Sequence, residues 1–296
     1  MHIRIADVDF LIASESLPLE FKNHLSAHTP FLTDTSDIDA LTDNINITCF
    51  LNSFPPTDSF QKIFQAEDSW SMLKDGEEYF LEIGSGSKET VCMARFDRQV
   101  RQVTVYCGNA LLDNVNGRKK LINPFSYPLD QLLFMYAMAE REGILVHASS
   151  VLINGRGYLF AGRSGAGKST ISNCFKLAGY EILNDDRIAI RRIGDRFRVF
   201  GTPWPGEADI AVNNSASLCG LFFIKHGIEN RATRLASREA IERLMPVTSI
   251  PWYDRDIIPS VLSLCEDLGF NIPAYELQFK PGREVIEFLE EFVPEV

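Results

Sequence analysis

The chain has 296 residues, of which 45% are hydrophobic and 23% are charged, and this composition excludes a disordered, collagen-like or low-complexity protein. Forty acidic residues outnumber 29 basic ones, which gives a formal net charge of −11 at pH 7. This acidity argues against a nucleic-acid-binding or membrane-surface protein, because phosphate-rich surfaces attract clustered Lys and Arg. The length predicts one large domain or two of moderate size.

The first residues and the apolar runs predict where the protein resides. The sequence begins without the basic segment and apolar core of a secretion signal, and no apolar run approaches the ~18 residues that cross a bilayer. We therefore expect a cytoplasmic protein without a membrane partner. The six cysteines are far apart in the sequence, so reduced thiols are expected rather than disulfides or a zinc site.

Residues 1–125 predict a mainly β N-terminal domain of unknown role. Residues 29–56 are rich in Asp, Asn, Thr and Pro, so we expect loops there. Elsewhere, alternating apolar residues and clusters of aromatic and branched residues indicate strands. The expected strands are residues 1–12, 78–83, 90–96 and 100–107, the last two joined by a hairpin turn at Asp97-Arg98-Gln99.

The sequence of residues 126–296 predicts a second domain, of the α/β class. Residues 123–128 are typical of a linker between the two domains. Helical and strand patterns alternate along most of the second domain, and such alternation is typical of an α/β core. The Asn154-Gly155 pair is typical of a tight hairpin between two apolar strands. The expected helices are residues 129–142, 168–178, 237–244, 256–268 and 283–292, and the expected strands are residues 144–153, 157–161, 180–183, 187–192, 196–200 and 221–224.

Residues 162–169 read Gly-Arg-Ser-Gly-Ala-Gly-Lys-Ser and fit the phosphate-loop pattern G-x-x-x-x-G-K-[ST] at every fixed position. Glycines let backbone N–H groups turn toward a polyphosphate, and the following helix directs its positive end at the same anion. Lys168 would contact the β- and γ-phosphates, and the Ser169 hydroxyl would ligate Mg²⁺. A turn that only starts a helix does not need this Lys-Ser pair. The predicted nucleotide-binding residues are Gly162, Arg163, Ser164, Gly165, Ala166, Gly167, Lys168, Ser169 and Thr170.

Two adjacent carboxylates, Asp185 and Asp186, follow the next expected strand shortly after the loop. A strand end beside a phosphate loop faces the binding site in an open α/β sheet. The two carboxylates can act there on different groups, one on Mg²⁺ and one on an incoming hydroxyl, because phosphoryl transfer needs charge neutralisation and a proton acceptor. The alternative interpretation is an Asx turn ahead of Arg187.

His147 lies in an apolar run ahead of the hairpin and could reach the same cleft. A single histidine in an apolar strand is more often a buried core residue, so the local pattern leaves both interpretations open.

Three features together resemble the catalytic domain of the HPr kinase/phosphorylase family in their order and spacing: His147-Ala148-Ser149-Ser150, the phosphate loop and Asp185-Asp186. The resemblance is strongest over residues 144–200. It implies a P-loop kinase core of the HPr kinase and phosphoenolpyruvate carboxykinase type, which uses ATP and phosphorylates a serine of a protein.

The resemblance also implies roles for individual residues. Lys168 would bind phosphate and Ser169 would bind Mg²⁺. Asp186 would be the general base, Asp185 would support the metal or the substrate, and His147 would be a further catalytic-site residue.

One segment departs from the family pattern. The family has a downstream Glu-x-Arg-Gly-Leu-Gly-type segment that supplies a metal-binding glutamate, whereas residues 201–207 of this chain read Gly-Thr-Pro-Trp-Pro-Gly-Glu. Glu207 could replace the missing carboxylate as a metal ligand, or it could belong to an ordinary surface turn. The chain is therefore similar to the divergent HPr-kinase-related proteins, some of which are associated with modified-peptide biosynthesis.

The leading hypothesis is an ATP- and Mg²⁺-dependent kinase that phosphorylates a hydroxyl, with a serine of a peptide or protein as the acceptor. The second is a small-molecule kinase that acts on free serine or a sugar. The third is a P-loop ATPase or scaffold of a modification complex that is not a kinase. A homo-oligomer is compatible with each of them.

Overall fold

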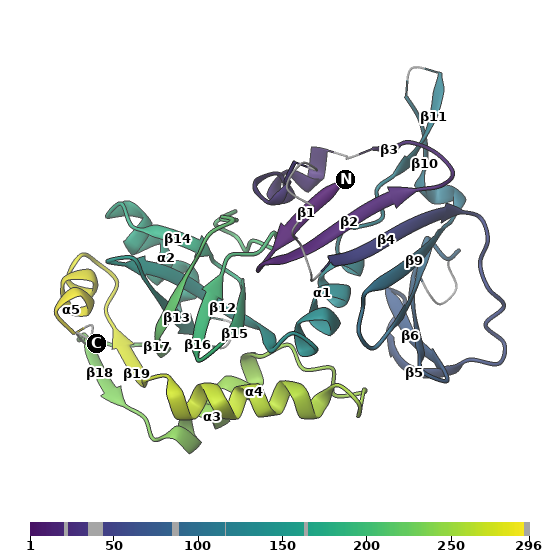
Figure 1. Cartoon of the computed structure of the whole chain (residues 1–296). Coiled ribbons are helices and arrows are strands. Elements are labelled where there is room, and N and C mark those ends of the chain that lie inside the picture. The colour runs from purple at the N-terminus through teal and green to yellow at the C-terminus, as the bar shows by residue number, and fades with distance from the viewer. Residues whose placement is uncertain (21–22, 35–43, 85–88, 116, 163–164, 293–296) are drawn as a thin grey trace. The chain divides into compact units, whose positions relative to one another are not determined.

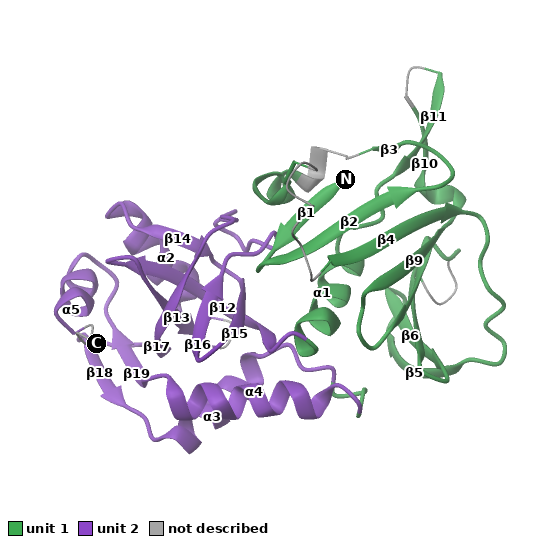
Figure 2. Ribbon diagram, in the orientation of Figure 1, with its two compact units in different colours: residues 1–140, 252–255 green, residues 141–251, 256–296 purple. Residues whose placement is uncertain are grey.

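The computed structural model of the chain describes residues 1–20, 23–34, 44–84, 89–115, 117–162 and 165–292 (Figure 1). The chain forms two compact units: unit 1 comprises residues 1–140 and 252–255, and unit 2 comprises residues 141–251 and 256–296 (Figure 2). The units divide later than the expected boundary at residue 125, because helix α1 (Leu129–Ala139) groups with unit 1.

Unit 1 contains an eight-stranded mixed sheet with the strand order β1-β2-β4-β9-β8-β7-β6-β5. Strands β2, β4 and β9 are parallel, and the other neighbouring strands are antiparallel. The strands are β1 (His2–Ile5), β2 (Val8–Ser14), β4 (Asn44–Leu51), β5 (Gln61–Ala66), β6 (Trp70–Asp75), β7 (Glu78–Ile83), β8 (Cys92–Asp97) and β9 (Gln102–Cys107). The strand expected over residues 1–12 is two strands, because Ala6 and Asp7 adopt positive φ angles and reverse the chain.

The loop prediction for residues 29–56 was wrong where β4 forms, while residues 35–43 of that stretch lie outside the described residues. Ile45, Ile47 and Cys49 are buried at alternate positions of β4. This period of two is that of a strand with one buried face, and the Asn and Thr residues that suggested a loop lie on the other face.

Unit 1 also contains smaller elements that the sequence did not predict. A three-stranded sheet has the order β10-β11-β3. The elements are β3 (Leu19–Glu20), the 3₁₀ helices η1 (Asn23–Phe31) and η3 (Asn109–Leu111), β10 (Leu112–Val115) and β11 (Arg118–Ile122).

A short segment from later in the chain, residues 252–255, completes unit 1. Its Asp254 is buried and accepts a hydrogen bond of 2.9 Å from the Tyr136 hydroxyl on α1. The Tyr253 ring stacks on Phe64 of β5 with ring centroids 4.4 Å apart. The chain therefore returns to unit 1 through a buried carboxylate and an aromatic contact.

Unit 2 has the helices and strands that the sequence predicted between residues 144 and 292, together with strands β18 and β19 and the 3₁₀ helix η4, which it did not predict. The helix predicted at residues 129–142 formed as α1, in unit 1. The strands are β12 (Gly143–Ile153), β13 (Arg156–Ala161), β14 (Glu181–Asn184), β15 (Arg187–Ile193), β16 (Arg196–Phe200), β17 (Ser215–His226), β18 (Arg231–Arg234) and β19 (Ala274–Phe279). The helices are α2 (Lys168–Leu177), α3 (Ser237–Leu244), the 3₁₀ helix η4 (Met245–Val247), α4 (Ile258–Asn271) and α5 (Glu284–Phe292).

Two long strands, β12 and β17, organise unit 2. The first half of β12 pairs with β15 and the second half with β13 and β14. Strand β17 pairs with β16 at its start and with β13 and β19 further along. Only β13, β17 and β19 form parallel neighbours among the described strands of this unit, so its sheet is mixed.

Helices α2 and α5 cover a core of unit 2. Ile171 and Phe175 of α2 pack with Val285 and Leu289 of α5 against apolar side chains of the strands, such as Phe160. Helices α3 and α4 lie side by side (Figure 1). The predicted α/β class is therefore confirmed. Within the described part of the chain, no helix has the length and apolarity needed to span a membrane.

Candidate active site

The site lies where β13 and β14 end. Both strands pair antiparallel with β12, so they run in the same direction and finish at the same edge. Ala161, at the end of β13, is opposite Ala148 of β12. The backbone N–H of Ala148 donates a hydrogen bond of 3.0 Å to the carbonyl of Asp186, just after β14. This strand pairing therefore brings the phosphate loop, the acidic pair and His147 together at one end of the strands, although most neighbouring strands of the sheet are antiparallel.

The loop between β13 and α2 has the backbone of a tight glycine turn. Gly165 and Gly167 have φ angles of 79° and 102°, in the left-handed region that favours glycine. A Cβ at Gly167 would lie 2.9 Å from the Phe279 ring, so this position also has no room for a side chain. Helix α2 begins at Lys168 and directs its positive end toward the loop. Arg163 and Ser164, which the sequence assigns to the loop, lie outside the described residues.

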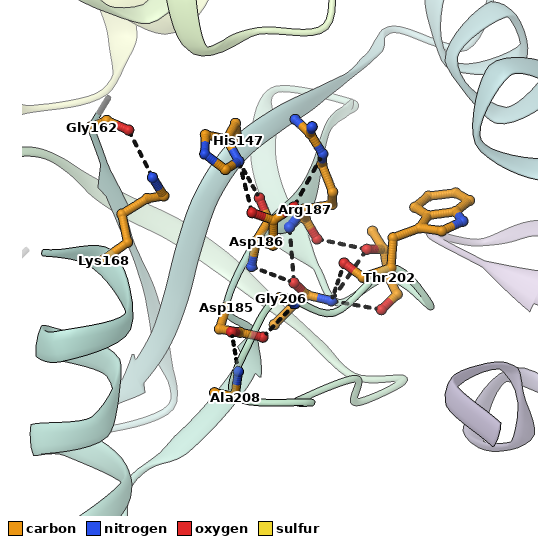
Figure 3. Close-up of polar contacts among 11 residues, drawn as sticks. His147, Gly162, Lys168, Asp185, Asp186, Arg187, Thr202, Gly206 and Ala208 are labelled. Carbon is orange, nitrogen blue, oxygen red and sulfur yellow. Dashed lines mark hydrogen bonds and ion pairs between the residues drawn. The ribbon is translucent and has the colours of Figure 1, made fainter. Parts of the chain in front are cut away.

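Lys168 is buried and points back across the loop. Its Nζ donates a hydrogen bond of 2.9 Å to the carbonyl of Gly162 (Figure 3). Burial lowers the pKa of Lys168, while the nearby Asp186 carboxylate acts in the opposite direction. An anion that displaced the Gly162 carbonyl would find a cation that is partly desolvated.

Asp185 is buried and holds the loop that follows β16. Its two carboxylate oxygens accept hydrogen bonds of 2.9 Å from the N–H groups of Gly206 and Ala208 (Figure 3). A Cβ at Gly206 would lie 2.7 Å from Asp185 Oδ2, so glycine is required for this approach. These contacts fix the loop that carries Glu207.

Asn184 shapes the turn between β14 and β15. Its side-chain oxygen accepts hydrogen bonds from the N–H groups of Asp186 and Arg187, at 2.7 and 2.9 Å. Its Nδ2 donates to the carbonyls of Thr202 and Trp204. An Asx-type turn is therefore present, as the alternative interpretation expected, but Asn184 makes it, and both aspartate side chains point elsewhere.

Asp186 pairs with His147 at the mouth of the site. His147 Nδ1 lies 2.9 Å from Asp186 Oδ1, and Arg187 Nε lies 3.4 Å from Oδ2 (Figure 3). Partial burial raises the pKa of Asp186, but the hydrogen bond to His147 and the positive charges of Arg187 and Lys168 outweigh it, so the net pKa is lowered. Asp186 is therefore an ionised, partly exposed carboxylate that is contacted by the side chains of His147 and Arg187.

These groups surround one cleft of about 780 Å³ in unit 2. The lining residues that the sequence predicted are His147, Gly165, Gly167, Lys168, Ser169, Thr170, Asp185, Asp186 and Glu207. Two lining residues were missed, Gly206 and His226. Gly206 belongs to residues 201–207, the segment that departs from the family pattern. The sequence signal that could have found His226 is its position shortly after the apolar run 221–224. Within the described residues, no cluster of three His, Cys, Asp or Glu side chains is placed to hold a metal ion by itself.

Unit 2 is therefore an α/β unit in which the phosphate-loop motif lies beside the acidic end of a strand. No family model matches the chain. The curated protein "Putative HPr kinase/phosphorylase 2" of Oceanobacillus iheyensis is 23% identical over 151 residues, which cover 50% of this chain and 46% of that protein. This relative confirms the resemblance to the HPr kinase/phosphorylase family. The chain spans about half the length of the relative.

A solved structure of a kinase also aligns with part of the chain. The HPr(Ser) kinase/phosphatase from Coxiella burnetii aligns with a TM-score of 0.30 and 16% identity, over 50% of this chain and 87% of that structure.

Proposed function

We propose that the chain is an ATP- and Mg²⁺-dependent kinase that transfers the γ-phosphate to a hydroxyl, namely a serine of a peptide or protein. In this proposal the part of residues 126–296 that forms unit 2 is a P-loop catalytic domain of the HPr kinase and phosphoenolpyruvate carboxykinase type. The observation that carries the proposal is the shared cleft, in which Lys168 of the loop and the carboxylate of Asp186 line the same space. The choice of a peptide or protein serine as the phosphate acceptor follows from the resemblance to the HPr kinase/phosphorylase family. Modified-peptide biosynthesis is one process in which such a kinase could act.

The loop fits a triphosphate. Gly165 and Gly167 adopt backbone angles that let N–H groups turn toward an anion, and the N-terminus of α2 adds its partial positive charge. Lys168 would exchange the Gly162 carbonyl for phosphate oxygens. The Gly162 carbonyl oxygen and a phosphate oxygen are both hydrogen-bond acceptors, and the phosphate oxygen carries the larger negative charge.

The cleft also offers oxygen ligands of the kind that Mg²⁺ takes. Ser169, Asp185 and Glu207 line it, and Mg²⁺ is commonly held by one or two carboxylates together with substrate phosphates. Asp185 already accepts two backbone hydrogen bonds, but carboxylate oxygens have further lone pairs for a cation. The metal, when bound, neutralises charge on the transferring phosphate.

Asp186 would accept the proton of the attacking hydroxyl. The acceptor oxygen forms a bond to the γ-phosphorus, the bond from that phosphorus to the β–γ bridging oxygen breaks, and ADP leaves with the electron pair. Asp186 suits this role better than Asp185, because its side chain is about 30% exposed whereas Asp185 is buried. His147 orients the Asp186 carboxylate through its Nδ1–H.

The experiment uses γ-labelled ATP, Mg²⁺ and a cell extract separated into small-molecule and macromolecular fractions. The proposal expects label on serine in the macromolecular fraction. Label in only the small-molecule fraction would replace it with the small-molecule kinase hypothesis. Release of inorganic phosphate without any labelled product would favour the ATPase or scaffold.

A further inference from the structure

His226 ends β17 at the edge where the phosphate loop begins. Strand β17 pairs parallel with β13, so both strands finish on the same side of unit 2. His226 lines the cleft, and its ring stacks on Phe279 of β19 with centroids 5.8 Å apart. A Cβ at Gly167 would lie 3.0 Å from His226 Cε1, so the ring packs directly against the loop.

The ring also contacts the loop through a polar atom. His226 Nε2 lies 3.2 Å from the carbonyl oxygen of Gly165. A carbonyl oxygen can only accept, so Nε2 carries the proton and donates. In a planar trans peptide the C=O points opposite to the N–H of the next residue. The contact therefore fixes the N–H of Ala166 on the side away from His226.

This orientation matters for an anion. Carbonyl oxygens carry partial negative charge and repel phosphate, whereas N–H groups attract it. In the described part of the loop, the Lys168 side chain engages the Gly162 carbonyl and the His226 side chain engages the Gly165 carbonyl. Phosphate binding would remove Lys168 from Gly162, so the His226 contact is the one that can persist in the bound state.

We propose that His226 is a positioning residue that holds the Gly165–Ala166 peptide with its N–H available to the polyphosphate. The inference rests on the proposed function and adds to it a determinant of nucleotide affinity that lies outside the phosphate-loop motif. His226 acts through the loop backbone and not on the acceptor.

Isothermal titration calorimetry with ATP and, separately, with tripolyphosphate tests the inference. His226→Phe keeps a ring for stacking on Phe279 but loses the donor, and it should weaken both ligands about fivefold, the value of one ordinary hydrogen bond. His226→Gln retains an N–H donor and should bind within twofold of the wild type. Ile228→Ala, a control at a residue that is 95% exposed just beyond β17, should bind like the wild type.

The outcomes separate the two proposals. If the wild type binds both ligands and His226→Phe binds them equally well, the role of His226 is wrong while the nucleotide site stands. If His226→Gln is as weak as His226→Phe, donation to Gly165 is not the cause, and the inference also fails. If the wild type binds neither ligand, the proposed function and the inference fail together. In turnover assays, the Phe variant should raise KM more than it lowers kcat.

Discussion

His147 Nδ1 lies 2.9 Å from Asp186 Oδ1, while the neighbouring Asp185 carboxylate faces the opposite way and binds two backbone N–H groups. Two adjacent acids thus have different environments. One is partly exposed beside a histidine, and the other is buried within the fold. Under the proposed function, this difference favours Asp186 over Asp185 as the proton acceptor.

Asp186→Asn should retain ATP binding and lose phosphoryl transfer by roughly 10²–10⁴-fold, because an amide does not accept the hydroxyl proton. The measurement is the rate of labelled product formation from γ-labelled ATP, with calorimetry for binding. Asp195→Asn is the matched control, since the Asp195 side chain is 95% exposed on the β15–β16 turn. Phosphoryl transfer at the wild-type rate by the Asp186→Asn variant would exclude Asp186 as the general base.

Lys168→Ala should weaken ATP binding by roughly 10- to 100-fold, the usual effect of losing a hydrogen bond between charged groups. Calorimetry measures the affinity. Lys176→Ala removes an exposed lysine from the same helix and should leave the affinity unchanged. Equal affinities for Lys168→Ala and the wild type would count against the loop as the phosphate site.

Asp185→Asn should loosen the loop that carries Glu207. The amide nitrogen of asparagine cannot accept a hydrogen bond, so the N–H of either Gly206 or Ala208 loses its partner, at a cost of about 1–3 kcal/mol. Hydrogen exchange of these two amides measures the effect, and Asp195→Asn again serves as the control. Unchanged protection of both amides would show that Asp185 does not hold the loop.

Glu276→Gln tests the pH dependence of stability. Hydrogen bonds from Lys225 and Arg243 lower the pKa of Glu276, outweighing a small effect of burial. A lowered pKa in the folded state stabilises the protein above the ordinary glutamate pKa, and this stabilisation disappears as the pH falls through the lowered value. The variant should therefore be less stable than the wild type by about 1 kcal/mol at pH 7, and the difference should vanish in acid.

Denaturant unfolding of both proteins across this pH range measures the difference. Glu242→Gln removes a more exposed ion pair with Arg238 and should change stability little at any pH. A difference between Glu276→Gln and the wild type that persists in strong acid would show that the charge of Glu276 is not the cause.

The structural features that were predicted correctly depend on local sequence. The glycine spacing of the phosphate loop and the helix after it are set within a few residues, and residues 237–244 formed the expected helix. Strand β4 was missed because its half-buried face carries Asn and Thr, which are common in loops.

The parts that were missed depend on contacts between distant segments. His226 reaches the cleft because β17 pairs with β13, and a single sequence does not show which strands pair. The different environments of Asp185 and Asp186 arise from Asn184, whose side chain makes the turn and so leaves both carboxylates for other partners. Local patterns therefore predicted which residues line the cleft better than how those residues are arranged in it.

A crystal structure with a non-hydrolysable ATP analogue and Mg²⁺ tests the central claim most directly. The account predicts the terminal phosphate about 3 Å from Lys168 Nζ, Mg²⁺ at the Ser169 hydroxyl, and the Asp186 carboxylate facing that phosphate with space for a hydroxyl between them. A triphosphate bound elsewhere on the chain, or an Asp186 side chain that faces away from the terminal phosphate, would contradict it.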